Sequence, residues 1–225
     1  LQSNQLNGSI PNLNLPNLTQ LYLLNNQLSG NIPNFNLPNL TFLFLNENQL
    51  SGTIPDFNLP SLIKLSLRGN QLSGAIPGFG NLSNLTELML NNNELSGAIP
   101  AFNMPNLASF RVDYNRLSGT IPNLNWSSLT NLYFDYNCGL TAYDAAQATV
   151  LTAKDPNWQA PNPSCSATDC NLVTEIPKAE CQELLSLYNS TNGSGWTNKT
   201  GWNVTNTPCS WYGVTCSGGH VSNLN

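Results

Sequence analysis

One asparagine recurs at nearly constant spacing through the first two-thirds of the chain, and it constrains the fold more than any other feature. Its seven copies are Asn4, Asn26, Asn48, Asn70, Asn93, Asn115 and Asn137, at intervals of 22 or 23 residues. Around them recurs the pattern LxxLxLxxNxLSGxIPxF, seen best in LTQLYLLNNQLSGNIPNF, residues 18–35. A period in the twenties predicts a solenoid, in which each coil buries its apolar side only against a neighbour.

The residue types in the pattern predict the structure of one coil. Leucines alternate in LYL, LFL, LSL and LML, so we expect a short parallel strand with leucines inward and the residues between them outward. The asparagine follows the strand, where its amide can bond the backbone of that turn and the next, forming a ladder along the stack. Phe35, Phe57, Phe79 and Phe102 are predicted to fill the core behind the Ile-Pro pairs.

The repeat resembles the leucine-rich repeat, and its LSGxIP half resembles the plant-type subclass. That subclass occurs in plant receptor ectodomains, polygalacturonase-inhibiting proteins and bacterial surface proteins. The resemblance implies an α/β solenoid, a leucine-rich-repeat stack with short parallel strands on the concave face, plus small helical disulfide-bonded caps. We assign residues 1–141 to a solenoid of seven repeats and residues 138–168 to a C-terminal cap, with a short helix over residues 142–154.

A second resemblance covers roughly residues 176–216, which end in CSWYGVTC. They are similar to the N-terminal cap of plant-type repeat ectodomains, with a helix, a tryptophan-containing loop and a final cysteine motif. We therefore predict that residues 169–216 form an N-terminal-type cap of a next solenoid, and that residues 217–225 start its first repeat.

The six cysteines all lie in the last two-fifths of the chain: Cys138, Cys165, Cys170, Cys181, Cys209 and Cys216. Six cysteines allow 15 pairings, and their clustering suggests disulfides in an oxidising, extracellular or cell-surface setting. The cap resemblance implies a Cys209–Cys216 pair. Proximity and elimination then favour Cys170–Cys181, and we expect Cys138 to bridge to Cys165.

The two ends of the sequence continue one another's pattern. Leu224 and Asn225, written before Leu1 and Asn4, restore the repeat in register. We interpret this as a unit-to-unit join, in which copies of the chain follow head to tail in a tandem array or fibre, whether covalent or not. A cap folded back onto its own first repeat and an ordinary chain boundary are the alternatives. The leading hypothesis is thus an extracellular structural or adhesive surface protein.

The alternative function is an extracellular recognition module that binds a protein or glycan through the concave face. Exposed aromatics beside few charges are typical of contact surfaces, although strand positions also favour aromatics for their own sake. The candidate residues, taken from the outward columns of the repeats, are Tyr22, Phe42, Phe44, Arg68, Met89, Arg111, Asp113, Tyr114, Tyr133, Asp135 and Tyr136.

Composition argues against several other classes. A net charge of −5 disfavours nucleic acid as a partner, and no apolar run approaches the length of a membrane span. One histidine and no CxxC pair argue against metal, and nothing predicts a cofactor. Asp113 and Asp135 occupy one column in adjacent coils, but a flat ladder offers no cleft to shield them, so we expect no enzyme.

Ten asparagines head N-x-S/T sequons and are candidate glycosylation sites: Asn7, Asn17, Asn39, Asn81, Asn84, Asn125, Asn189, Asn192, Asn198 and Asn203. A chain this rich in Asn, Ser and Thr also generates the triplet by chance.

Overall fold

The computed structural model describes residues 1–124, 128–160, 168, 170–191, 193–203 and 206–225. The chain divides into two compact units, Leu1–Pro163 and Ser164–Asn225, which we treat separately. Within the described ranges, no helix has both the length and the apolarity needed to cross a bilayer.

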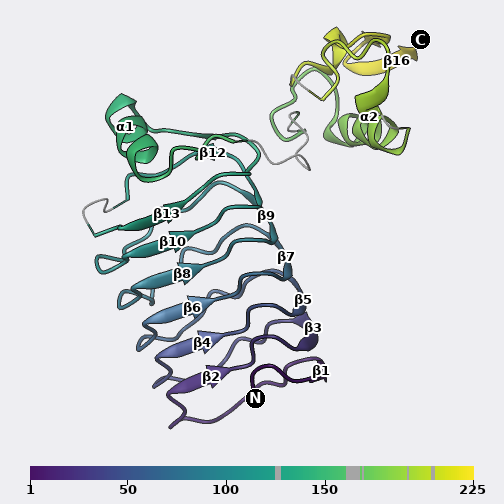
Figure 1. Ribbon diagram of the computed structural model, residues 1–225. Helices are drawn as coiled ribbons and strands as arrows, with labels where there is room; N and C mark the ends of the chain where they lie inside the picture. Colours follow the sequence, from purple (N-terminus) through teal and green to yellow (C-terminus); the bar gives the residue numbers. More distant parts are fainter. Residues whose placement is uncertain (125–127, 161–167, 169, 192, 204–205) are drawn as a thin grey trace. The chain divides into compact units, whose positions relative to one another are not determined.

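The first unit is a stack of coils whose strands form two parallel sheets (Figure 1). The first of these sheets has the strand order β13-β10-β8-β6-β4-β2. Its strands are β2 (Gln20–Tyr22), β4 (Phe42–Phe44), β6 (Lys64–Ser66), β8 (Glu87–Met89), β10 (Ser109–Arg111) and β13 (Asn131–Tyr133). The predicted leucine-rich-repeat solenoid with short parallel strands is confirmed.

The LSG half of each repeat forms the second parallel sheet, in the order β1-β3-β5-β7-β9-β11. Its strands are β1 (Asn7–Gly8), β3 (Gln27–Asn31), β5 (Gln49–Gly52), β7 (Gln71–Gly74), β9 (Glu94–Gly97) and β11 (Arg116–Leu117). A short pair, β12 (Gly119–Thr120) and β14 (Leu140–Thr141), continues this side. Gly52 shows why the motif needs glycine: its φ is +76°, and a Cβ there would lie 2.3 Å from Oδ1 of Asn31.

Leucine and phenylalanine side chains from successive coils form one continuous core. The four predicted phenylalanines stack at centroid distances of 6.4 Å (Phe35 to Phe57), 6.4 Å (Phe57 to Phe79) and 6.2 Å (Phe79 to Phe102). The leucines of the central strands are fully buried. Each coil therefore depends on its neighbours for burial, as a solenoid requires.

The asparagines form the predicted ladder, with one difference in direction. Asn48 donates from Nδ2 to the carbonyl of Leu45 in its own coil and to that of Leu23 in the preceding coil, both at 3.0 Å. Its Oδ1 accepts the Leu28 N–H at 3.0 Å, again from the preceding coil. Asn70, Asn93, Asn115 and Asn137 repeat these contacts. The bonds between coils thus run to the preceding coil rather than to the next.

Helix α1 (Ala145–Lys154) and the residues after it close the far end of the stack (Figure 1). In every earlier coil the residue after the strand donates its N–H to a backbone carbonyl of the following coil, as Val112 does to Tyr133 at 3.0 Å. After β13, the N–H of Phe134 donates instead to Oδ2 of Asp155 at 2.7 Å. Tyr136 likewise donates to the Ala160 carbonyl at 2.7 Å. The Asp155 side chain and the Ala160 carbonyl thus accept the hydrogen bonds that the backbone of a further coil would accept.

The second unit has its own small core of aromatics and cystines. It contains α2 (Lys178–Ser190), the 3₁₀ turns η1 (Gly193–Gly195) and η2 (Pro208–Ser210), β15 (Val214–Ser217) and β16 (His220–Leu224). The predicted Cys170–Cys181 and Cys209–Cys216 disulfides are confirmed. Cys165, the predicted partner of Cys138, lies outside the described residues, so that pairing stays a prediction.

The segment predicted to start a new repeat is a strand, but its partner is local. β16 pairs antiparallel with β15, and Glu180 of α2 accepts hydrogen bonds from the Val221 N–H and contacts the His220 ring. At the other terminus, the Asn4 side chain donates to the carbonyls of Leu1 and Gln2 in its own segment. Among the described residues, the first strand of the sheet β13-β10-β8-β6-β4-β2 is β2, in the second coil. The join of Leu224 and Asn225 to Leu1 and Asn4 therefore stays a prediction.

The end-capping role of Asp155 is testable by mutation. Asp155 is buried, so Asp155→Ala leaves the Phe134 N–H without an acceptor and should lower the free energy of unfolding by about 1–3 kcal/mol. Asp155→Asn keeps an acceptor and should cost about 1 kcal/mol or less. Denaturant titration of the purified chain measures both changes.

The matched control is Asp56→Ala, at an exposed carboxylate in the middle of the solenoid, with an expected change within about 0.5 kcal/mol. Equal effects of Asp155→Ala and Asp56→Ala would contradict the capping role.

Candidate functional site

The outward residues of sheet β13-β10-β8-β6-β4-β2, with those that follow each strand, form one surface that we call the concave face. The strands pair in register. One row therefore contains Gln20, Phe42, Lys64, Glu87, Ser109 and Asn131, and a second contains Tyr22, Phe44, Ser66, Met89, Arg111 and Tyr133. These are the rows that the repeat spacing predicts. Six of the predicted binding residues therefore lie on a rigid ladder, and the other five, Arg68, Asp113, Tyr114, Asp135 and Tyr136, follow the strands.

Three aromatic side chains gather on β2 and β4. The rings of Tyr22 and Phe44 lie 5.2 Å apart, and those of Phe42 and Phe44 lie 6.3 Å apart at an interplanar angle of 7°. All three are half-buried, so their rings still present apolar surface to solvent. This end of the face offers an aromatic platform, in which the Tyr22 ring is tilted by 42° from that of Phe44.

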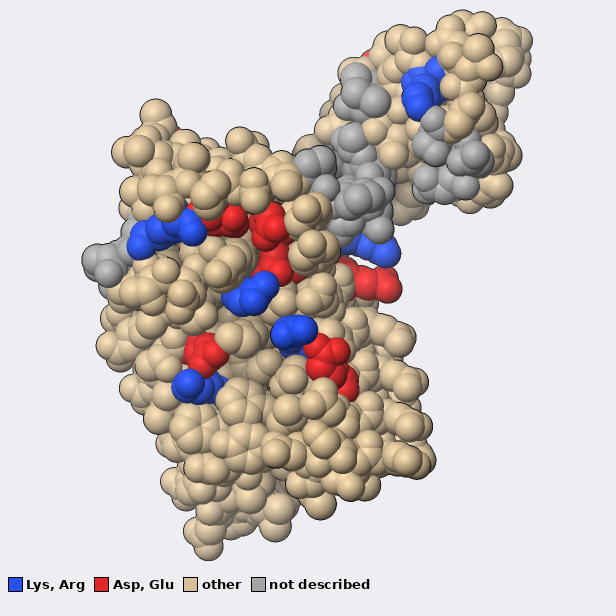
Figure 2. Space-filling view, viewed as in Figure 1, with Lys and Arg blue, Asp and Glu red and all other residues tan. Residues whose placement is uncertain are grey.

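Ion pairs between adjacent coils occupy the middle of the face, and Figure 2 shows basic and acidic side chains next to one another on this side of the first unit. Lys64 contacts Glu87 at 2.8 Å, and Arg68 contacts Glu47 at 3.2 Å. A shallow depression of about 440 Å³ lies over β6, β8, β10 and β13, with Lys64, Met89 and Tyr133 in its lining. The predicted residues Met89, Arg111 and Tyr133 thus line this hollow.

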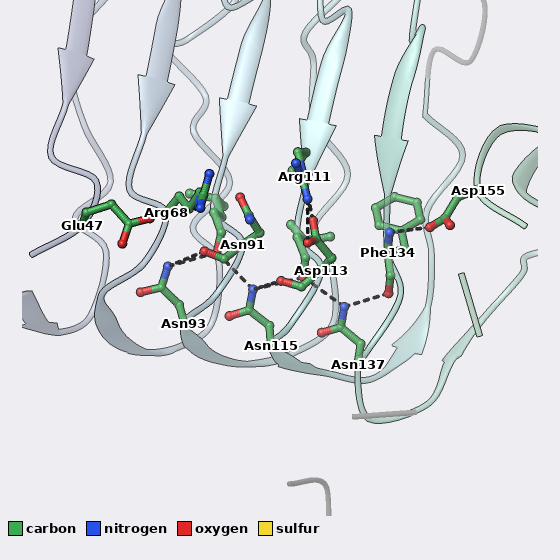
Figure 3. Close-up of polar contacts among 12 residues, drawn as sticks. Glu47, Arg68, Asn91, Asn93, Arg111, Asp113, Asn115, Phe134, Asn137 and Asp155 are labelled. Atoms are coloured by element: carbon green, nitrogen blue, oxygen red, sulfur yellow. Dashed lines mark hydrogen bonds and ion pairs between the residues drawn. The ribbon is translucent and has the colours of Figure 1, made fainter. Parts of the chain in front are cut away.

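Arg111, which helps to line this hollow, forms a bidentate ion pair with Asp113 (Figure 3). Nε and an Nη atom of Arg111 donate to the two carboxylate oxygens of Asp113 at 3.0 and 2.8 Å, and this bond raises the pKa of Arg111. The guanidinium also lies 4.4 Å from the ring centroid of Tyr133. From the sequence we expected no cleft that would shield the two aspartates, but Asp113 is only 1% exposed. Its pairing with Arg111 satisfies both oxygens and allows the burial.

Tyr114 and Tyr136 stack at the last two coils, with centroids 4.4 Å apart. Both occupy left-handed backbone positions, with φ of +54° and +53°, where side chains this large are costly. Asn25, Gly69 and Asn92 fill the same position in other coils, and these residue types were a sequence signal for this turn that we did not use. Beside the pair, burial and the carboxylates of Asp155 and Asp113 raise the pKa of Asp135.

Two further residues on this face were in the outward columns but not among the predicted binding residues. Glu47 pairs with Arg68, and its carboxylate lies so close to Gly69 that a Cβ there would be 2.8 Å away. Asn91 follows β8 and is 1% exposed. No sequence signal separates it from Asn46, which occupies the same column and is half-buried.

The candidate glycosylation sites divide by exposure. Asn7, Asn17, Asn39, Asn81, Asn84 and Asn198 are exposed and Asn203 is half-buried. Asn39 and Asn84 already donate to carbonyls of the preceding coil, those of Pro16 and Pro60. Asn125, Asn192 and the side chain of Asn189 lie outside the described residues.

The buried ion pair generates a prediction with an internal control. Arg111→Ala leaves the buried Asp113 carboxylate without its partner and should lower the free energy of unfolding by about 2–3 kcal/mol, less than for a wholly buried pair because Arg111 is a third exposed. Arg68→Ala breaks an ion pair whose side chains are 48% and 44% exposed. It should therefore change the free energy of unfolding by about 0.5 kcal/mol or less. Denaturant titration that finds equal losses for the two variants would refute this assignment.

Comparison with protein-family models finds leucine-rich repeats and a cap. The model described as Leucine Rich Repeat matches residues 39–58, and Leucine Rich repeats (2 copies) matches residues 60–104. The Leucine rich repeat N-terminal domain matches residues 177–217. No curated protein matches the chain in sequence.

Solved structures include similar solenoids. The plant peptide hormone receptor RGFR1, solved in complex with RGF2, is 40% identical with a TM-score of 0.54, covering 62% of this chain and 24% of that one. The Arabidopsis receptor kinase HAESA, solved with the peptide hormone IDA and the co-receptor SERK1, is 35% identical with a TM-score of 0.57, covering 61% and 25%. InlP of Listeria monocytogenes is 38% identical with a TM-score of 0.54, covering 66% and 42%.

The chain spans less than half the length of each of these three solved chains. The matched repeats, the matched N-terminal domain and the similar solenoids identify it as a leucine-rich-repeat protein that resembles plant receptor ectodomains.

Proposed function

We propose that the chain is an extracellular recognition module that binds a peptide or protein through the concave face. The observation that carries the proposal is the in-register ladder, which holds an aromatic platform, a charged hollow and a tyrosine pair on one continuous surface. Two similar solenoids were solved with peptide hormones bound, which supports a peptide as the partner. Two disulfides agree with an extracellular or cell-surface location.

The chemistry of the face suits a partner that lies along the stack. Aromatic rings on β2 and β4 supply desolvated apolar contact, which dominates the energetics of many interfaces. The ion pairs of the middle coils supply polar contacts that fix register and orientation rather than raw affinity. Because the strands hold these side chains in place, little ordering remains to be done on binding.

This proposal takes the recognition alternative over the tandem array, because two of the three similar solenoids reported above are receptors. Head-to-tail association through Leu224, Asn225, Leu1 and Asn4 stays a prediction, as do adhesion, glycosylation, a glycan ligand and the lack of enzymatic activity.

Removing aromatic side chains from the concave face should weaken peptide binding without unfolding the chain. We expect the triple variant Tyr22→Ser, Phe44→Ser, Tyr133→Ser to bind peptides selected on the wild-type chain at least about tenfold more weakly, because each ring lost removes apolar contact. The probe is a library of random displayed peptides panned on the immobilised chain, and calorimetry with synthesised winners gives the affinities.

The control is Tyr143→Ser, at a tyrosine that is 69% exposed and lies off the concave face, beside α1. Its peptide affinities should stay at the wild-type value. Selected peptides that bind the triple variant and the wild type equally would refute the proposal, as would a selection that enriches none.

A further inference from the structure

Asn91 is a buried side chain with an unused hydrogen-bond acceptor. The residue is 1% exposed, and its Oδ1 accepts no hydrogen bond from any described residue. Buried polar groups in folded proteins are almost always paired, so an orphaned carbonyl needs an explanation. An amide oxygen accepts an N–H or O–H donor, which defines what is missing here.

The neighbours of Asn91 show that the orphan is specific to this position. Figure 3 places it between Arg68 and the Arg111–Asp113 pair, and its own backbone carbonyl accepts the Gly69 N–H at 3.1 Å. Asp113, the next residue in the column, has both oxygens bonded to Arg111. The repeat itself therefore does not force an unpaired group into this column.

A second acceptor lies further along the same column. Asp135 is half-buried beside the Tyr114–Tyr136 stack and forms no ion pair within 4 Å among the described residues. Arg111, the guanidinium whose charge acts on Asp135, is committed to Asp113. Burial raises the pKa of Asp135, as do the neighbouring carboxylates of Asp155 and Asp113, and the negative charge of these carboxylates would favour an added cation there.

The spacing of the two acceptors fits an extended peptide. Asn91 and Asp135 are two coils apart, which is about 10 Å at the usual spacing of neighbouring strands. An extended chain covers that span in about three residues at roughly 3.3 Å each. A ligand running along the stack can therefore address both positions at once.

We propose that Asn91 and Asp135 form a peptide-binding site on the concave face. The Asn91 oxygen accepts a backbone N–H of an extended peptide, and the Asp135 carboxylate binds a lysine or arginine side chain about three residues away along the peptide. This inference rests on the proposed function and specifies its ligand class. A ligand reaches the buried oxygen when a flanking side chain moves, and Arg68 can do so because its pair with Glu47 is solvent-exposed.

The test uses the 225-residue chain and peptides selected from a random displayed library on the wild type. Asn91→Ala should weaken their binding about three- to tenfold, the value of one hydrogen bond. Asn46→Ala, at the half-buried asparagine of the same column, is the matched control and should change affinity by less than about twofold. Asp135→Asn should weaken the binding of peptides that contain a basic residue. Replacing the lysine of such a peptide by alanine should remove the effect of Asp135→Asn.

Thermal unfolding separates binding from structure. Asn91→Ala removes an oxygen that accepts no hydrogen bond from the described residues, so the Tm of this variant should fall no further than that of Asn46→Ala. Asn91→Leu, which fills the space with an apolar side chain, provides a second variant if the alanine leaves a void. Affinities within about twofold of the wild type for both Asn91 variants would overturn the assignment of Asn91. Selected peptides without a basic residue, unaffected by Asp135→Asn, would overturn that of Asp135.

The same experiments distinguish failure of this site from failure of the proposed function. Peptides that lose affinity for the Tyr22, Phe44 and Tyr133 triple serine variant but not for the Asn91 variants would leave recognition standing and refute this site. Peptides insensitive to both sets of variants would refute concave-face recognition itself.

Discussion

The hydrogen bonds that each ladder asparagine makes to the preceding coil are the interaction on which the solenoid depends. The turn after each strand leaves backbone carbonyls and N–H groups inside the stack, where water cannot satisfy them. Asn115 and Asn137, which are buried, satisfy groups of two coils at once. Leucine burial supplies the driving force for stacking, and the amide ladder fixes the register in which stacking occurs.

Register is also what creates the candidate site. A recognition surface built on consecutive strands needs side chains from different coils at reproducible separations, and the parallel ladder provides them without a loop having to fold first. The aromatic platform, the ion pairs and the tyrosine stack each combine residues from neighbouring coils. At the far end, Asp155 and Ala160 supply acceptors that another coil would have supplied, so the last coil keeps the geometry of the others.

The sequence predicted the structural features that recur in every coil and missed those that occur in a single coil. Periodicity was sufficient for the leucine core, the phenylalanine stack and the rows of the concave face, and the cap motif for the Cys209–Cys216 pair. The Arg111–Asp113 pair that allows the burial of Asp113 and the orphaned Asn91 each occur in one coil, so the repeat pattern does not encode them. The same holds for Asp155, since its carboxylate acts where the repeat stops. The left-handed position of Tyr114 and Tyr136 had a signal in the residue types of other coils that the sequence analysis did not use.

Native-state hydrogen exchange of the Asn93→Ala variant tests the ladder most directly. The Leu72 N–H donates to Oδ1 of Asn93, and the Leu50 N–H donates to Oδ1 of Asn70 in the coil before. The account predicts that the variant lowers the opening free energy at Leu72 by about 1–3 kcal/mol, and lowers it less at Leu50. Unchanged protection at Leu72 in a folded variant would contradict the claim that these amides hold the coils in register.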